Sequence, residues 1–309
     1  MSYTKTEVEA NTIFRLIVGS KLYGTDTPDS DQDEKGVCVM SKENYLGFMK
    51  EFQQMNYSEQ DVEIYDISKF FTLAAKNNPN ILDMLFAPRK YWLKTSDIWE
   101  RVYENRYLFL SKKVKHSFLG YANAQLKRIE THKKWLLNPP DHQPTRQEFG
   151  ITERPAPKEY MSAILSIPSE YLNEGLRDNV VKEKNYQKAL DSYNSYETWK
   201  RERNPARAAL EAKINYDAKS ATHLYRLMLQ GKEVLETGDV RPDRRGIDAD
   251  VLREIRFCKW PYEKLMEKVA EIESQMNDLY EKSTLRYEPD IHAIQQLHVD
   301  ILRDYVYNY

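Results

Sequence analysis

The stretch Gly19-Ser20-Lys21-Leu22-Tyr23-Gly24, followed by Ser30-Asp31-Gln32-Asp33, decides the fold of this chain. It comes directly after an apolar run at 13–18, which predicts a buried strand. Turn-forming residues separate its two halves, and the apolar run at 37–40 predicts a second strand. This order indicates a small domain of strands and helices, with a polar site where the first strand ends.

Asp31 and Asp33 are spaced i and i+2, so on an extended strand their carboxylates point to the same face. Two negative charges so close together are unfavourable unless a cation lies between them. Mg²⁺ prefers such oxygen ligands, and a pair of Mg²⁺ ions can hold the attacking and leaving oxygens of a phosphoryl displacement. Next to them, Gly19 lets a phosphate approach the backbone, and the Ser20 hydroxyl can bind phosphate oxygens.

A third strand is predicted at 61–65, where polar and β-branched residues alternate. Asp61 and Glu63 lie on the same face of this strand. Either acid could accept the proton of an attacking hydroxyl or hold a metal ion, with Asp61 preferred as the third acid and Glu63 as the alternative. A helix is predicted at 66–77, and its Lys69 could neutralise phosphate charge.

From residue 111 onward the pattern is mainly helical. A loop at 138–158, rich in proline, separates the first of these helices from the rest. The expected helices span 111–137, 179–203, 205–230, 248–256, 261–282 and 289–308. The chain is therefore expected to be α+β, with a small sheet-containing domain before a helical one.

The composition is that of a folded globular protein, with 41% apolar and 30% charged residues. No apolar run approaches the ~20 residues that cross a bilayer, and the polar N-terminus shows no signal-peptide pattern, so no membrane partner and a cytoplasmic location are expected. The net charge of −2 hides a basic segment at 111–160, with ten Lys/Arg against five Asp/Glu. That segment could attract polyphosphate or nucleic acid, or could be a solvated helix face. No histidine pair has zinc spacing.

Three further constellations have two interpretations each. Lys219, His223 and Arg226 are spaced i, i+4 and i+7, so one helix face offers three phosphate ligands or a plain basic surface stripe. The basic stretch 127–134 could bind single-stranded nucleic acid or a base, although Trp135 at its end is expected to be a packing anchor. Arg146, in the proline-rich loop, is either a phosphate clamp or an ordinary loop residue.

Gly19-Ser20 with Ser30-Asp31-x-Asp33 resembles the hallmark of the DNA polymerase β nucleotidyltransferase superfamily. Stretches along nearly the whole chain resemble its RNA-repair-pathway polymerase-β-like subfamily. They are residues 19–37, Asp61-x-x-x-Tyr65-Asp66-x-x-Lys69-Phe70, Asn78-Pro79-Asn80-x-Leu82-Asp83-x-Leu85-Phe86, 144–150, 219–227, Ile255-Arg256 and 283–290. Two positions depart from the subfamily pattern: Lys35 replaces an expected arginine, and Arg286 replaces a usual proline.

The resemblance implies an α+β fold: a polymerase-β-like nucleotidyltransferase domain with a small mixed sheet and flanking helices, then a mainly α-helical domain. The expected boundaries are 1–110 for the catalytic domain and 111–309 for a helical, substrate-binding domain with its proline-rich loop. The implied site has Asp31, Asp33 and Asp61 (or Glu63) as catalytic and metal-holding acids. Nucleotide binding is assigned to Gly19, Ser20, Lys69, Lys219, His223 and Arg226.

The implied activity is that of an Mg²⁺-dependent enzyme that moves a nucleoside monophosphate from a nucleoside triphosphate to an acceptor hydroxyl and releases pyrophosphate. The acceptor suggested by the subfamily is an RNA end. A protein side chain or a small molecule is the alternative acceptor. A non-enzymatic, nucleotide-binding regulator is a third interpretation, and it fits less well because the acids of the motif are all present.

Overall fold

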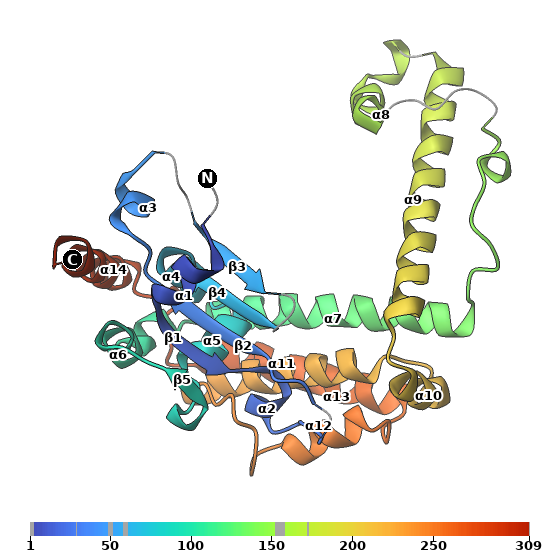
Figure 1. Cartoon of the computed structure of the whole chain (residues 1–309). Coiled ribbons are helices and arrows are strands. Elements are labelled where there is room, and N and C mark those ends of the chain that lie inside the picture. The colour runs from blue at the N-terminus through green and yellow to red at the C-terminus, as the bar shows by residue number, and fades with distance from the viewer. Residues whose placement is uncertain are drawn as a thin grey trace. The chain divides into compact units, whose positions relative to one another are not determined.

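The computed structural model describes residues 3–28, 30–48, 52–57, 61–151, 158–171 and 173–308. The chain forms two compact units: unit 1 comprises Met1–Ile129 and Asp217–Tyr309, and unit 2 comprises Glu130–Tyr216. Their elements are labelled in Figure 1. The predicted division at residue 110 separates a catalytic from a substrate-binding role. The two compact units are defined by packing and do not show which residues carry out catalysis or bind substrate, so the division at residue 110 stays a prediction.

Unit 1 contains a five-stranded mixed sheet in the order β3-β4-β2-β1-β5. β2 and β4 are parallel, whereas β1 pairs antiparallel with β2 and β5, and β3 with β4. The strands are β1 (Thr12–Ile17), β2 (Glu34–Cys38), β3 (Gln54–Tyr57), β4 (Val62–Asp66) and β5 (Trp92–Lys94). The predicted α+β fold with a small mixed sheet is thereby confirmed.

The three predicted strands correspond to β1, β2 and β4, but β3 and β5 were not expected from the sequence. Both are edge strands of only a few residues with mostly partly exposed or exposed side chains, so they carry no apolar alternation. The expectation that Asp31 and Asp33 lie on a strand is wrong. β2 begins at Glu34, so Asp33 lies just before the strand and Asp31 lies in the preceding loop.

Aromatic side chains fix helices against the sheet. Phe14 of β1 stacks on Trp99 of α6 (Asp97–Glu104), with ring centroids 3.7 Å apart. Phe70 of α4 (Ile67–Ala75) meets the edge of the same tryptophan at 5.4 Å. Val8 of α1 (Lys5–Ala10) joins a second buried cluster that includes Val62 of β4. The sheet is thereby rigidly supported beside the strand ends that carry the acids.

The remaining helices of unit 1 surround this sheet or pack on one another, and α11 packs against α12 and α13. They are α2 (Gly19–Tyr23), α3 (Lys42–Leu46), α5 (Pro79–Leu85), the first part of α7 (Lys113–Leu137), α11 (Ala218–Thr237), α12 (Ala249–Arg256), α13 (Tyr262–Lys282) and α14 (Ile291–Asn308), with the 3₁₀ turns η1 (Arg89–Tyr91) and η2 (Arg106–Phe109).

The single helix predicted at 205–230 is wrong at both its middle and its end. The chain breaks at Asn215, whose φ is 58°, and α11 then runs through Gly231 to Thr237. A Cβ at Gly231 would lie 3.0 Å from the Phe118 Cβ and 2.8 Å from the Met276 Cε. The glycine therefore marks a close approach of α7 and α13 to α11 rather than a helix end.

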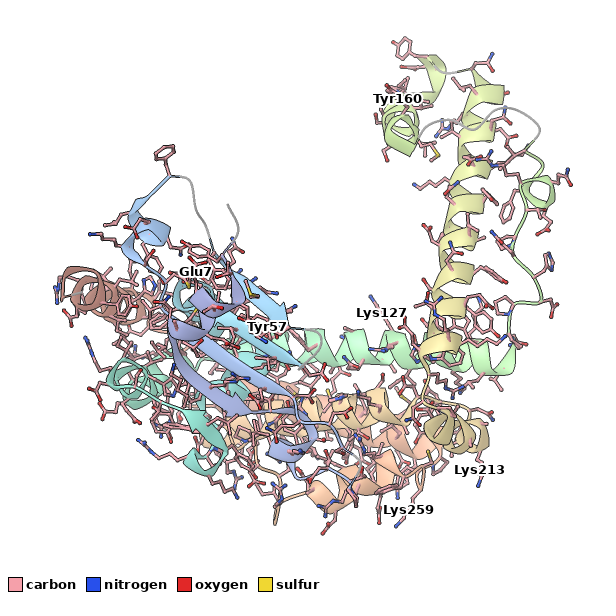
Figure 2. All side chains as sticks on the ribbon, viewed as in Figure 1. Glu7, Tyr57, Lys127, Tyr160, Lys213 and Lys259 are labelled. Atoms are coloured by element: carbon pink, nitrogen blue, oxygen red, sulfur yellow. The ribbon has the colours of Figure 1, made fainter. Side chains whose placement is uncertain are left out.

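Unit 2 consists of the end of α7 with η3 (Gln147–Phe149), α8 (Lys158–Ser166), η4 (Ser169–Tyr171), α9 (Glu174–Glu202) and α10 (Pro205–Ile214). The rings of Trp135, Tyr196, Trp199 and His132 form one cluster, which confirms Trp135 as a packing anchor. Along α9, few side chains are buried, and most project into the open (Figure 2).

The proline-rich loop also belongs to unit 2, and residues 152–157 of it lie outside the described residues. Arg146 donates a hydrogen bond to the buried Glu183 at 2.9 Å, so this arginine ties the loop to α9. Throughout the described part of the chain, every helix is too short or too polar to cross a membrane.

Candidate active site

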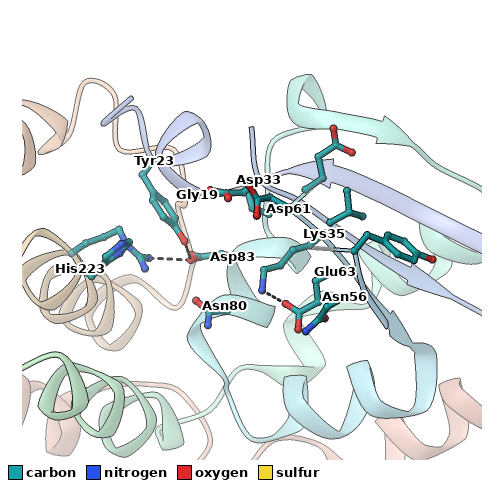
Figure 3. Close-up of a pocket in the computed structure, with 15 residues that line it drawn as sticks. Gly19, Tyr23, Asp33, Lys35, Asn56, Asp61, Glu63, Asn80, Asp83 and His223 are labelled. Atoms are coloured by element: carbon teal, nitrogen blue, oxygen red, sulfur yellow. Dashed lines mark hydrogen bonds and ion pairs between the residues drawn. The ribbon is translucent and has the colours of Figure 1, made fainter. Parts of the chain in front are cut away.

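A pocket of about 390 Å³ opens in unit 1 beside the ends of β1, β2, β3 and β4. Helices α2, α5 and α11 contribute the rest of its wall (Figure 3). Its polar and charged lining residues are Asp33, Glu34, Lys35, Asn56, Asp61, Glu63, Asn80, Asp83, His223 and Arg226, together with Gly19 and Tyr23.

Two aspartates lie side by side where the neighbouring strands β2 and β4 begin. In the parallel pairing of β2 and β4, Glu34 is opposite Val62, so the residues just before them, Asp33 and Asp61, are neighbours (Figure 3). The Glu34 N–H donates to the Asp61 carbonyl oxygen at 3.0 Å. Strand pairing therefore brings together two acids that are far apart in the sequence.

Gly19 faces this pair at the start of α2. Its φ of +68° lies in the left-handed region, where glycine is the least strained residue. A Cβ added there would lie 2.3 Å from the Asp33 Oδ2. Any other residue would push into the carboxylate, so glycine is required at this position by both backbone conformation and space.

The carboxylates are electrostatically crowded. Burial raises the pKa of Asp33, the charges of Asp61 and Asp31 raise it further, and Lys219 opposes them. A divalent cation would relieve this crowding, and carboxylate oxygens are the donors that Mg²⁺ prefers. The donor chemistry thus fits a magnesium ion. Within the described ranges, no group of three or more Asp, Glu, His or Cys side chains is already gathered as a metal site.

Glu63, the alternative third acid, has a different environment from Asp61. Lys35 donates to its carboxylate at 2.6 Å, as the dashed line in Figure 3 shows. Burial raises the pKa of Glu63, but hydrogen bonds from Lys35 and Tyr65 outweigh burial and leave the pKa lowered. Glu63 is therefore already neutralised by a lysine, whereas Asp61 adds to the negative charge around Asp33.

His223 lines the opposite wall, on α11 (Figure 3). Burial, followed by the charges of Arg226 and Lys219, lowers its pKa to about 3. The imidazole is therefore neutral near pH 7, so it can form hydrogen bonds but adds no positive charge to the pocket.

A buried network holds Arg226 in the pocket wall. Its Nη1 lies 3.0 Å from the Asp83 Oδ2, and the two side chains are 4% and 1% exposed. The Tyr23 hydroxyl donates to the same carboxylate at 2.9 Å, and the Gln230 amide donates to its other oxygen at 3.1 Å. The guanidinium also stacks over the Tyr23 ring at 3.8 Å. This network joins α2, α5 and α11.

A second set of contacts fastens the turn after α2. The Arg245 Nη2 donates to the Lys21 carbonyl oxygen at 2.9 Å and to the Asp26 carboxylate at 3.2 Å. The Arg244 N–H donates to the Tyr23 carbonyl oxygen at 3.3 Å. Residues more than 200 positions away in the sequence thus hold the turn that begins at Gly19.

The structure brings most of the predicted site residues together. Gly19, Asp33, Asp61, Glu63, His223 and Arg226 line the pocket; Asp31 and Lys219 act on Asp33 through their charges; and Ser20 follows Gly19 in α2. Lys69 is the exception. It lines a separate cavity with Asp66 and donates to Gln54 at 2.8 Å.

Sequence reasoning missed Tyr23, Lys35, Asn56, Asn80 and Asp83 as pocket residues. A signal existed for two of them. The Asn78 side chain caps α5 and Pro79 occupies its first turn, which places Asn80 and Asp83 at i and i+3 on one helix face. For Lys35 and Asn56 the strand pairing had to be known, and Tyr23 reaches the pocket from α2.

The mixed sheet brings two aspartates beside a glycine turn, which is the arrangement expected from the resemblance to polymerase β nucleotidyltransferases. Residues 1–140 match the model of the RNA repair pathway DNA polymerase beta family, RlaP. Polymerase β family nucleotidyltransferases are enzymes with a nucleoside triphosphate substrate, and they typically use divalent metals.

Over 304 residues the chain is 28% identical to the "Uncharacterized 38.9 kDa protein in nrdC-mobD intergenic region" of Enterobacteria phage T4. The alignment covers 86% of this chain and 88% of the phage protein. No solved structure is significantly similar to the chain.

Proposed function

We propose that the chain transfers a nucleoside monophosphate from a nucleoside triphosphate to a hydroxyl at an RNA end. The observation that carries the proposal is the pairing of Asp33 and Asp61 across β2 and β4, facing Gly19 in one pocket. An RNA acceptor is favoured because the matched family is described as an RNA repair pathway family.

In this proposal Asp33 and Asp61, with Asp31 on the adjoining loop, hold two Mg²⁺ ions. When bound, such ions neutralise charge on the attacking and leaving oxygens. The crowding that raises the pKa of Asp33 supports this assignment. Among the described residues, no lysine forms an ion pair with Asp61, whereas Lys35 pairs with Glu63. Asp61 is therefore preferred to Glu63 as the third acid.

The triphosphate lies along the turn at Gly19 and Ser20, where the missing side chain leaves room beside Asp33. Lys219, whose charge acts on both Asp33 and His223, offsets phosphate charge. His223 contributes a hydrogen bond as a neutral imidazole. Arg226 acts indirectly, because its pairing with Asp83 positions α2.

The reaction forms one bond and breaks one bond. The acceptor oxygen bonds to the α-phosphorus, the bond from that phosphorus to the α–β bridging oxygen breaks, and pyrophosphate leaves with the electron pair. Asp61 takes the hydroxyl proton as general base, from a position beside Asp33. Positioning and charge stabilisation by the pocket supply most of the rate enhancement expected for such a transfer.

The test is transfer of label from each α-labelled nucleoside triphosphate to RNA, to protein or to small-molecule hydroxyls, with pyrophosphate release measured in parallel. Asp33→Asn and Asp61→Asn should abolish both signals, while Glu63→Gln should retain substantial activity. Asp250→Asn is the matched control, since its side chain is 95% exposed on α12.

The outcomes separate the candidate functions. Label in RNA supports the proposal. Label in protein or a small molecule instead replaces the acceptor while keeping the chemistry. Nucleotide binding without pyrophosphate release under any acceptor would leave only the regulator.

A further inference from the structure

A further cavity on unit 1, of about 610 Å³, is lined by basic and aromatic side chains. It is formed by the end of α4, the start of α7, the end of α13 and the segment before α14. We call it the basic groove. Its wall includes Lys76, Lys113, His116, Ser117, Tyr280 and Tyr287. None of these residues lines the pocket that contains Asp33 and Asp61.

The basic groove has an excess of positive charge. Lys113 is paired with Glu288, which also lines the groove. Lys76 lines the groove, whereas Lys115 is not a lining residue but lies over the Tyr280 ring, and neither lysine forms an ion pair with any residue that the structure describes. Lys112 is nearly buried, and its Nζ donates to the Glu281 carbonyl oxygen at 3.4 Å. Among the described residues, Lys76 and Lys115 thus have no carboxylate partner, and this uncompensated positive charge favours an anionic ligand.

Two tyrosines interleave with these lysines. The Lys112 Nζ lies 4.4 Å from the Tyr287 ring centroid, and the Lys115 Nζ lies 4.6 Å from that of Tyr280. The two rings meet edge to face, with centroids 6.1 Å apart. Tyr287 is nevertheless 62% exposed, so much of its ring is open to a ligand.

This combination points to single-stranded nucleic acid. Lysines attract the phosphates, and an exposed aromatic ring offers a platform on which a base can stack. An acidic peptide would satisfy the lysines but would gain little from an open tyrosine face. A duplex hides its base faces within its own stack. The groove also belongs to the same compact unit as the catalytic pocket, and α4 follows directly from β4, the strand that begins beside Asp61.

We propose that the basic groove binds a single-stranded segment of the RNA acceptor. Lys76, Lys113 and Lys115 contact its phosphates, and Tyr287 stacks on a base. The assignment of RNA as the ligand rests on the proposed function, whereas the groove itself rests on its charge and aromatic side chains. The groove holds the body of the strand, away from the reacting end.

The test is fluorescence anisotropy of the full chain with a labelled, unstructured RNA of about 12 nucleotides, a length within the range bound by known single-strand folds. The dependence of affinity on salt is measured for each variant. Lys76→Gln and Lys115→Gln should each lower the slope of log K against log salt by about 0.7, the value for one neutralised phosphate on a single strand. Tyr287→Ala should weaken binding at least fivefold with the salt slope unchanged.

Two variants serve as matched controls. Lys268→Gln removes an equal charge from α13, where the lysine pairs with Glu271, and Tyr171→Ala removes a tyrosine that is 77% exposed in unit 2. Neither should change RNA binding. The proposal would be overturned if the control and groove variants lost RNA affinity equally, or if the groove variants lost no RNA affinity. Displacement of RNA by polyglutamate, with no effect of Tyr287→Ala, would overturn it in favour of an acidic protein partner.

The same variants separate this inference from the proposed function. Asp33→Asn should bind the RNA like the unaltered chain while losing transfer. RNA binding through the groove without transfer by the unaltered chain would refute the proposed function alone. If the chain transfers a nucleotide to RNA and all groove variants bind RNA with unaltered affinity, only the proposed RNA-binding role of the groove is refuted.

Discussion

The buried pair of Asp83 and Arg226 gives the sharpest prediction. In Asp83→Asn the side chain keeps its size but loses its charge, so the Arg226 guanidinium is left buried without its counter-ion. Both side chains are almost inaccessible to water, at 1% and 4% exposure. Removing one partner of such a pair costs about 3–5 kcal/mol, because the remaining charge is neither solvated nor paired. We expect a loss of that size in the free energy of unfolding of unit 1.

The assay combines calorimetry with hydrogen exchange. For a unit of this size, each 1 kcal/mol lowers the melting temperature by about 2–4 °C, so the transition should fall by roughly 6–20 °C. Amide exchange should accelerate in α2, α5 and α11, which the network joins. The Michaelis constant for the nucleoside triphosphate should rise, because α2 begins at Gly19.

The double variant Asp83→Leu with Arg226→Met is the critical comparison. Replacing both charges by apolar groups of similar size should restore part of the lost stability, since no unpaired charge remains. A cost below about 1 kcal/mol for Asp83→Asn, or a double variant as unstable as the sum of the single ones, would refute the reasoning. Asp250→Asn, on the exposed face of α12, should leave the transition unchanged.

Three further outcomes are expected. Gly19→Ala should lower the free energy of unfolding by roughly 1–3 kcal/mol and abolish nucleotide binding, because the new Cβ would meet Asp33. Urea unfolding measures the first effect and titration calorimetry the second. A normal nucleotide affinity in this variant would contradict the prediction. Phe14→Ala should cost about 3–5 kcal/mol, because its buried ring stacks on Trp99; a smaller loss in urea unfolding would mean that the core collapses around the gap.

The third outcome concerns pH. The pKa of His223 is about 3 in the folded chain and about 6.5 in the unfolded one, so on acidification the unfolded state takes up the proton first. Stability should therefore fall as the pH drops below about 6.5, and His223→Gln should show a shallower fall; parallel pH profiles contradict the assignment.

The sequence by itself predicted the α+β fold, the strands that became β1, β2 and β4, and the acids and glycine of the site. These features depend on local patterns: an apolar run, a turn-forming glycine and closely spaced carboxylates. The resemblance stated from those motifs is confirmed over residues 1–140. Short edge strands such as β3 escaped prediction, since their exposed residues carry no periodic apolar signal.

Only the tertiary structure decided which of the predicted residues lie together and which are already paired. Asp61 became the neighbour of Asp33 because β4 pairs with β2 in a particular register, and Glu63 was set apart because the same pairing placed Lys35 against it. Arg226 looked like a phosphate ligand on a helix face, yet α5 brings Asp83 to it across 143 positions of sequence. Helical spacing shows which side chains share a face, but the charge that meets that face depends on long-range packing.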